Sequence, residues 1–130
     1  MTDRRLDVAL KQFGPLGARI MREIWDGGVE EPFTVRSVQA RMPELAYNTV
    51  LTILTRLATR GVLTFTPASG RNPYQYRAAM DPEQFLVWAV RRDAERMVAR
   101  YGEVALSAFG EQLDQLTPEQ RERLHGLIER

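Results

Sequence analysis

The sequence predicts a mainly α-helical protein with a small β wing. Two short amphipathic helices are separated by a turn, two strands of alternating polarity follow directly, and helical periodicity returns after residue 80. This order is typical of a winged helix-turn-helix domain. We assign that domain to residues 1–80 and a helical dimerisation region to residues 81–130.

The first predicted helix begins at Pro15 and ends before the pair Gly27 and Gly28. Proline is favoured at the first position of a helix and glycine just after its last residue. Ile20 and Ile24 recur at helical spacing, so this side of the helix is expected to face the core.

The helix-turn-helix is predicted from the segments FTVRSVQARMP and YNTVLTILTRLATRG. Phe33 is expected in a short strand, and Thr34 is expected to be the N-cap of a helix that ends before Pro43. The second helix runs from Tyr47 to Gly61, and this glycine is expected to end it in the left-handed conformation.

The wing is predicted from the segment VLTFTPASGRNPYQYRA. Leu63 and Phe65, and then Tyr74 and Tyr76, alternate with polar neighbours, while ASGRN supplies turn residues. The sequence therefore places a hairpin directly after the second helix.

The C-terminal region contains the segments DPEQ and TPEQ, each with an N-cap, a proline and a glutamine in helix-starting order. Helices are therefore expected after Asp81 and Thr117, with another after Gly102.

Short amphipathic helices cannot cover their own apolar faces, so we expect a second copy of the chain to do so. For Trp88 and Phe109, a role in packing is favoured over a role in ligand binding. The predicted dimerisation residues are Phe85, Trp88, Val104, Phe109, Leu113, Leu124, Leu127 and Ile128.

The composition excludes several classes of function. There is no cysteine and a single histidine, His125, so thiolate chemistry, zinc ribbons and Ser-His-Asp catalysis lack their residues. No paired carboxylates or phosphate-binding loop converge. We expect no enzyme activity, no cofactor and no metal. Without a signal peptide or an apolar run of about 18 residues, the sequence also predicts a cytoplasmic protein.

The charges are distributed unevenly although the net charge is only +1. Residues 1–80 carry eleven Arg or Lys against seven Asp or Glu, and residues 81–130 carry seven against ten. No acidic residue lies between Glu44 and Asp81, whereas Arg56, Arg60 and Arg71 lie in that window. A surface kept free of negative charge favours binding of nucleic acid.

The second helix of the helix-turn-helix carries Asn48, Thr49, Thr52 and Arg56 on its outer side. Threonine is a poor helix former, so helix propensity does not explain this face. In helix-turn-helix proteins the first half of this helix enters the major groove, where Asn pairs with adenine, Arg with guanine, and a Thr methyl with the thymine methyl. A merely solvated face is the alternative, but such faces usually mix Glu and Lys.

Further contacts are predicted outside this helix. Arg71 would reach a phosphate or the minor groove, and the hydroxyl of Tyr74 or Tyr76 would bond the DNA backbone; an ordinary hairpin is the alternative. Arg36 and Ser37 would hold a phosphate in the first turn of the preceding helix, or else be plain exposed residues. The predicted DNA-binding residues are Arg36, Ser37, Tyr47, Asn48, Thr49, Thr52, Arg56, Arg60, Gly70, Arg71, Tyr74 and Tyr76.

Three segments carry a resemblance to a known family: LGARIMREIW, TVRSVQARM, and AYNTVLTILTRLATRGVLT followed by GRNPYQY. They resemble the BlaI/MecI family of bacterial repressors, the penicillinase repressors, which also includes the CopY copper regulators. The resemblance implies a homodimer whose winged helices bind an inverted-repeat operator in double-stranded DNA and block transcription, with the C-terminal helices forming most of the dimer. By position, the recognition helix of the family falls on Tyr47 to Arg60 and its wing arginine on Arg71.

The sequence departs from the family in three places. Gly17 stands where the family commonly has an acidic residue, and the chain lacks the cysteine cluster with which CopY proteins sense metal. Members linked to β-lactam sensing are cut by a membrane protease at an Asn-Phe step, and the similar place here is Ala108-Phe109. The sequence therefore leaves the inducing signal and any sensor or protease open.

The alternative function is that of a winged helix used as a protein–protein interaction module without sequence-specific DNA binding. The acid-free face would then dock on a protein partner. Salt dependence separates the two hypotheses, because binding to DNA falls steeply as salt displaces the protein from phosphates.

Overall fold

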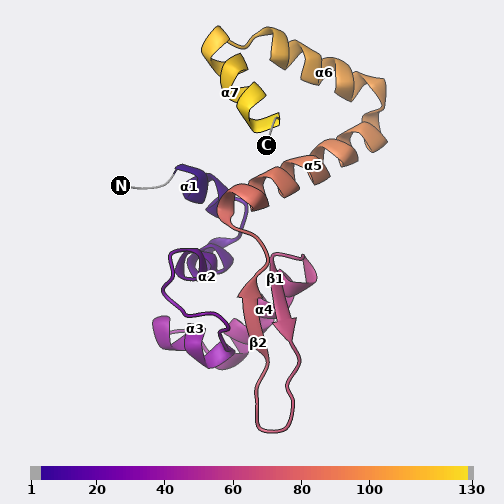
Figure 1. The fold of residues 1–130 in the computed structure, drawn as a ribbon. Helices are drawn as coiled ribbons and strands as arrows, with labels where there is room; N and C mark the ends of the chain where they lie inside the picture. Colours follow the sequence, from indigo (N-terminus) through magenta and orange to yellow (C-terminus); the bar gives the residue numbers. More distant parts are fainter. Residues whose placement is uncertain (1–3, 129–130) are drawn as a thin grey trace. The chain divides into compact units, whose positions relative to one another are not determined.

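The computed structural model describes residues 4–128, with the side chains of Leu127 and Ile128 excepted. Within these residues the predicted class is confirmed: the chain is mainly helical with one two-stranded antiparallel sheet (Figure 1). By its internal contacts the chain divides into two compact units, with the boundary between Trp88 and Ala89, inside a helix. The elements are α1 (Arg4–Leu10), α2 (Pro15–Trp25), α3 (Val35–Arg41), α4 (Tyr47–Thr59), β1 (Leu63–Thr66), β2 (Gln75–Ala78), α5 (Pro82–Tyr101), α6 (Glu103–Asp114) and α7 (Pro118–Ile128).

The helix-turn-helix consists of α3, residues 42–46 and α4. As predicted, Thr34 is the N-cap of α3: its Oγ1 accepts a hydrogen bond from the Ser37 N–H, and the Ser37 Oγ accepts one from the Thr34 N–H. The turn is held by the Gln39 side chain, whose Nε2 donates to the Leu45 carbonyl at 3.1 Å. Gly61 follows α4 with φ of 85°, which confirms the expected left-handed ending.

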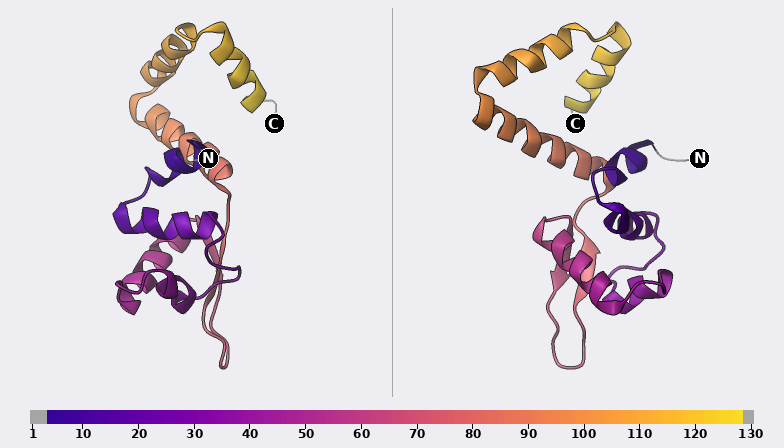
Figure 2. Two further views of the ribbon diagram at one scale, coloured as in Figure 1. Left: turned by 90° about the vertical axis from the view of Figure 1, so that its left-hand side faces the viewer. Right: turned by 180° about the vertical axis from the view of Figure 1, so that it is seen from behind.

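The wing is a hairpin in which β1 and β2 pair with Phe65 opposite Tyr76. Phe33, expected in a short strand, adds a single antiparallel bridge on the other side of Tyr76. The loop between the strands extends beyond the helices in every view (Figures 1 and 2). At its tip Ser69 and Asn72 face each other across Gly70, whose φ of 58° suits the first central residue of a type II′ turn.

The core of the winged-helix unit forms where α2, α3, α4 and β1 meet. Ile20, Val38, Val50 and Leu54 are fully buried there, at the apolar positions that helical spacing predicts. Helix α1 was not predicted from the sequence. It packs on α2, with its buried residues Leu6, Ala9 and Leu10.

Four aromatic rings form a cluster that includes the start of α5. The Phe85 ring lies 5.0 Å from Phe13, 5.7 Å from Trp25 and 5.9 Å from Trp88, between ring centroids. Phe85 is completely buried in this cluster. The prediction that Phe85 contributes to a dimer surface was therefore wrong, because its own chain already covers it.

The C-terminal unit consists of the rest of α5 with α6 and α7. The capping boxes predicted at Asp81 and Thr117 are both present, each with reciprocal hydrogen bonds to the glutamine three residues later. Within the described residues the three helices pack only sparsely on one another. Large apolar side chains therefore stay exposed, among them Val90, Met97, Tyr101, Val104, Leu106 and Leu113.

We expect Phe85→Ala to lower the free energy of unfolding by about 3 kcal/mol or more, because it empties the centre of the aromatic cluster. Val87→Ala is the matched control, since Val87 lies two residues away on the same helix and is 43% exposed. Urea denaturation followed by tryptophan fluorescence measures both. Similar losses for the two variants would contradict the placement of Phe85 in the core.

Candidate nucleic-acid interface

Helix α4 has one buried and one exposed side. Val50, Leu54 and Leu57 are buried, whereas Asn48 and Thr52 are exposed, as predicted. Arg56 and Arg60 are exposed as well, while Thr49 is half-buried. Tyr47, a predicted DNA-binding residue at the start of the helix, is 42% exposed and lines a hollow beside the wing.

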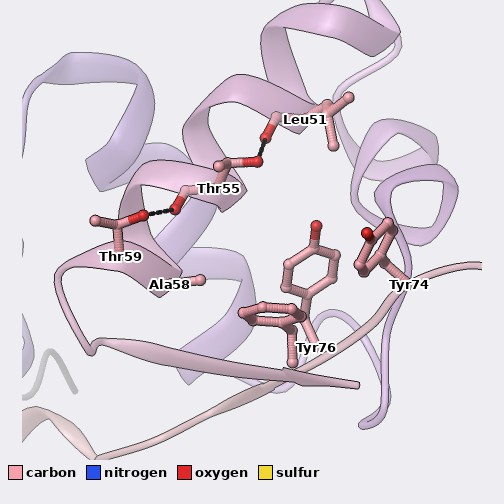
Figure 3. A pocket seen from close by; sticks show the side chains of 7 residues that line it. Leu51, Thr55, Ala58, Thr59, Tyr74 and Tyr76 are labelled. Atoms are coloured by element: carbon pink, nitrogen blue, oxygen red, sulfur yellow. Dashed lines mark hydrogen bonds between the residues drawn. The ribbon is translucent and has the colours of Figure 1, made fainter. Parts of the chain in front are cut away.

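Three of the four threonine hydroxyls of α4 are bonded to the helix itself. Oγ1 of Thr52 donates to the Asn48 carbonyl at 2.8 Å, Oγ1 of Thr55 to the Leu51 carbonyl at 2.8 Å, and Oγ1 of Thr59 to the Thr55 carbonyl at 2.9 Å. Figure 3 shows the last two bonds running along the helix. Each of these three threonines thus satisfies its own proton donor inside the helix.

Three hollows border α4, and no acidic residue lines any of them. One, of about 310 Å³, lies between α4 and the wing (Figure 3) and is lined by Leu51, Thr55, Ala58, Thr59, Phe65, Tyr74 and Tyr76. A second, of about 450 Å³, lies where α3 and α4 meet the wing loop and includes Arg36, Tyr47, Arg71 and Tyr74. The third, of about 370 Å³, lies beside the start of α2 and includes Phe13, Ile53, Arg56 and Arg60.

The arginines of the domain divide into two groups. Arg5, Arg19, Arg22 and Arg41 form ion pairs with carboxylates on α1, on α2, in the turn before α4 or on α5. The arginines near the three hollows form no ion pair within the described residues, and the guanidinium of Arg60 lies 5.0 Å from the centre of the Phe13 ring. Arg36, Arg56, Arg60 and Arg71 are therefore cations beside α4 that no carboxylate of the described residues neutralises.

Glu44 is the carboxylate that immediately precedes the acid-free window, and it is neutralised by its surroundings. Arg19 forms an ion pair and a hydrogen bond with it, and this hydrogen bond lowers the pKa of the Glu44 carboxyl. The negative charge closest in sequence to α4 is thus held against a positive one.

Tyr76 does not face solvent, although a contact of its hydroxyl with DNA was predicted. It is 3% exposed, and its ring lies 5.9 Å from Phe33 and 6.3 Å from Phe65. Burial raises the pKa of the Tyr76 phenol, Tyr47 and Tyr74 add to the rise, and a hydrogen bond with Thr55 opposes it. Tyr76 is therefore a packing residue that ties the wing to α4, and the prediction is corrected accordingly.

Ser37, which was predicted to hold a phosphate, is part of the N-terminal cap of α3. Its hydroxyl and its N–H are both used in the cap of α3, and the side chain is half-buried. Arg36, next to it, is exposed and lines the hollow beside the wing loop together with Arg71. The structure therefore brings Arg36 and the wing arginine to one hollow.

Two apolar residues that line the hollows were missed by the sequence analysis. Leu51 lines both hollows on the wing side, and Phe65 is 52% exposed in the hollow between α4 and the wing. Strand alternation predicts on which face of the hairpin Phe65 lies. It does not predict that α4 leaves this face partly uncovered.

Comparison with known proteins identifies the family of the chain. The family model described as "Penicillinase repressor" matches residues 13–130. The chain belongs to the penicillinase repressor family. Members of this family are DNA-binding transcriptional repressors, not enzymes. Helix α1 lies outside the matched residues.

A comparison of the chain with curated proteins found no match. Among the residues that the structure describes, no helix is long and apolar enough to cross a membrane. The same part of the chain contains no group of three or more His, Cys, Asp or Glu side chains placed to hold a metal ion.

We expect Tyr76→Ala to lower the free energy of unfolding by about 3 kcal/mol, because it removes a buried ring between Phe33 and Phe65. Tyr74→Ala is the matched control on the same hairpin, where the side chain is 46% exposed, and its effect should stay below about 1 kcal/mol. Chemical denaturation compares the two. If the two variants were equally stable, Tyr76 would be a surface residue and its assignment to the core would be wrong.

Proposed function

We propose that this repressor acts as a homodimer that binds an inverted-repeat operator and blocks transcription. The observation that carries the proposal is the exposed side of α4, which combines Asn48, Thr52 and the unpaired Arg56 on a helix that contains no acidic residue. Such a surface can enter the major groove of DNA without repulsion from phosphates.

Affinity would come mainly from the arginines around this helix. Arg36 and Arg71 share one hollow, and Arg56 and Arg60 share another on the opposite side of α4. If α4 lies in the major groove, the two pairs can each reach a sugar–phosphate backbone that borders the groove. Gly70 would present Arg71 at the tip of the wing through its type II′ turn.

The dimer would form through the C-terminal unit. Val104 is 73% exposed and Leu113 is 48% exposed on α6, and Val90 is 63% exposed on α5. Phe109 and Leu124 are half-buried, whereas the side chains of Leu127 and Ile128 lie outside the described residues. A second copy packed about a two-fold axis is the simplest way to cover this apolar surface and to match a palindromic site.

We propose no cofactor for this activity and a cytoplasmic location, where a bacterial repressor meets the chromosome. The Ala108-Phe109 step lies within α6, in a helical conformation. Proteolytic release at this step would therefore require α6 to unwind locally, because a peptide must be extended to enter most proteolytic sites.

The proposal is tested by selecting bound duplexes from a random pool and measuring the affinity for the enriched site at several salt concentrations. A palindromic site is expected, with a log–log salt slope of about −0.9 per phosphate neutralised. Absence of any enriched duplex, together with weak salt-independent binding, would overturn the proposal in favour of a protein-interaction module.

For the selected duplex, Asn48→Ala and Arg56→Ala should each weaken specific binding by about 1–3 kcal/mol while leaving the melting temperature unchanged, since both side chains are exposed. Arg22→Ala is the matched control, because Arg22 is an exposed arginine that pairs with Asp7 away from α4. Gel-shift titration measures the affinities. Binding of the α4 variants at the wild-type level would refute the assignment of this face.

A charge placed in the exposed apolar surface of α6 should disrupt the dimer. We expect Val104→Asp and Leu113→Asp to give monomers in sedimentation velocity, because a carboxylate cannot be buried in an apolar interface without a large desolvation cost. Glu111→Ala, which alters an exposed position of the same helix, serves as the control. A wild-type mass for both aspartate variants would show that α6 lies outside the dimer interface.

A further inference from the structure

The hydrogen bonds of the α4 threonines restrict what this helix can offer to DNA. A hydroxyl has one proton, and Oγ1 of Thr52 and of Thr59 each gives that proton to a backbone carbonyl four residues earlier. Neither side chain then has a donor left for the acceptors N7, O6 or O4 on base edges. What remains available on each of them is a methyl group and the lone pairs of the oxygen.

Thr52 is the threonine best placed to contact a base. It is exposed and lies one turn after Asn48, in the first half of α4 that helix-turn-helix proteins insert into the major groove. Thr55 lies with Tyr76 in the lining of the hollow between α4 and the wing, and Thr59 lies in the last turn of the helix. The two later threonines thus differ from Thr52 in position.

Among the four bases only thymine carries a methyl group in the major groove, at C5, and apolar contact is the way proteins read it. We infer that Thr52 is a specificity-determining residue of the proposed operator complex, and that it selects thymine through methyl–methyl contact instead of a donated hydrogen bond. This inference rests on the proposed function and names the base that the exposed face of α4 recognises. The intrahelical hydrogen bond fixes the side chain in advance, so little rotamer entropy is lost on binding.

The test uses the full-length protein and the duplex enriched by selection. Each thymine is replaced in turn by deoxyuridine, which removes only the C5 methyl group and leaves the hydrogen-bonding edges unchanged. At one thymine per half-site, uracil should weaken wild-type binding about fourfold, the factor expected for losing the burial of one methyl-sized group.

Two substitutions at the same position separate the methyl from the hydroxyl. Thr52→Ser keeps the hydroxyl and should bind the thymine and uracil duplexes equally, at the affinity that the wild type shows for uracil. Thr52→Val keeps a methyl and should retain the fourfold preference for thymine. Thr59→Ser is the control, because Thr59 makes the same intrahelical bond in the last turn of α4, and it should keep the wild-type preference.

Equal melting temperatures of all variants would show that the helix is intact in each of them. An enriched duplex whose affinity does not change with uracil at any position would overturn this inference while leaving the proposed function standing. Loss of the thymine preference in Thr52→Val would also overturn it, since the hydroxyl would then be the reading group. If no duplex is enriched at all, the proposed function and this inference fail together.

Discussion

Burial of one side of α4 is the constraint on which the rest of the winged-helix unit depends. Val50, Leu54 and Leu57 pack toward α2, α3 and β1, and they thereby set which side chains of α4 face outward. A rotation of the helix by one residue, about 100°, would bring polar side chains into the core, which carries a large desolvation cost. The orientation of the proposed reading face is thus determined by packing alone. The wing depends on the same helix, because β1 packs on α4 and Tyr76 of β2 lines one hollow with Thr55 of α4.

The distribution of ion pairs also distinguishes the surface around α4 from the rest of the winged-helix unit. One carboxylate each on α1, on α2, in the turn before α4 and on α5 forms an ion pair with Arg22, Arg41, Arg19 and Arg5, respectively. Exposed pairs of this kind contribute little to stability. Their larger effect is electrostatic, because the arginines on either side of α4 are left to produce a positive potential that attracts a polyanion.

Much of the fold could be predicted from the sequence because its signals are local. The caps at Thr34, Asp81 and Thr117 and the glycine after α4 each depend on a few neighbouring residues, and the structure contains all of them. The errors concern residues whose surroundings come from distant segments. Sequence spacing gave no sign that Phe85 would be enclosed by Phe13 and Trp25 or that Tyr76 would lie between Phe33 and Phe65, and α1 was too short for its periodicity to stand out. For the exposed side of α4, the residue types could be predicted, but the bonding of the threonine hydroxyls depends on rotamers.

The cap of α3 shows how interface chemistry limits local stability. In a capping box the third residue of the helix is usually Glu or Gln, yet here it is Ser37, directly after Arg36 and close to the hollow that Arg36 shares with Arg71. A glutamate at this position would complete a stronger cap, and its carboxylate would also interact favourably with the positive end of the helix dipole. It would equally place a carboxylate beside the proposed phosphate contacts. The serine therefore represents a trade-off between stability and function, in which the helix keeps a weaker cap so that its first turn stays free of negative charge.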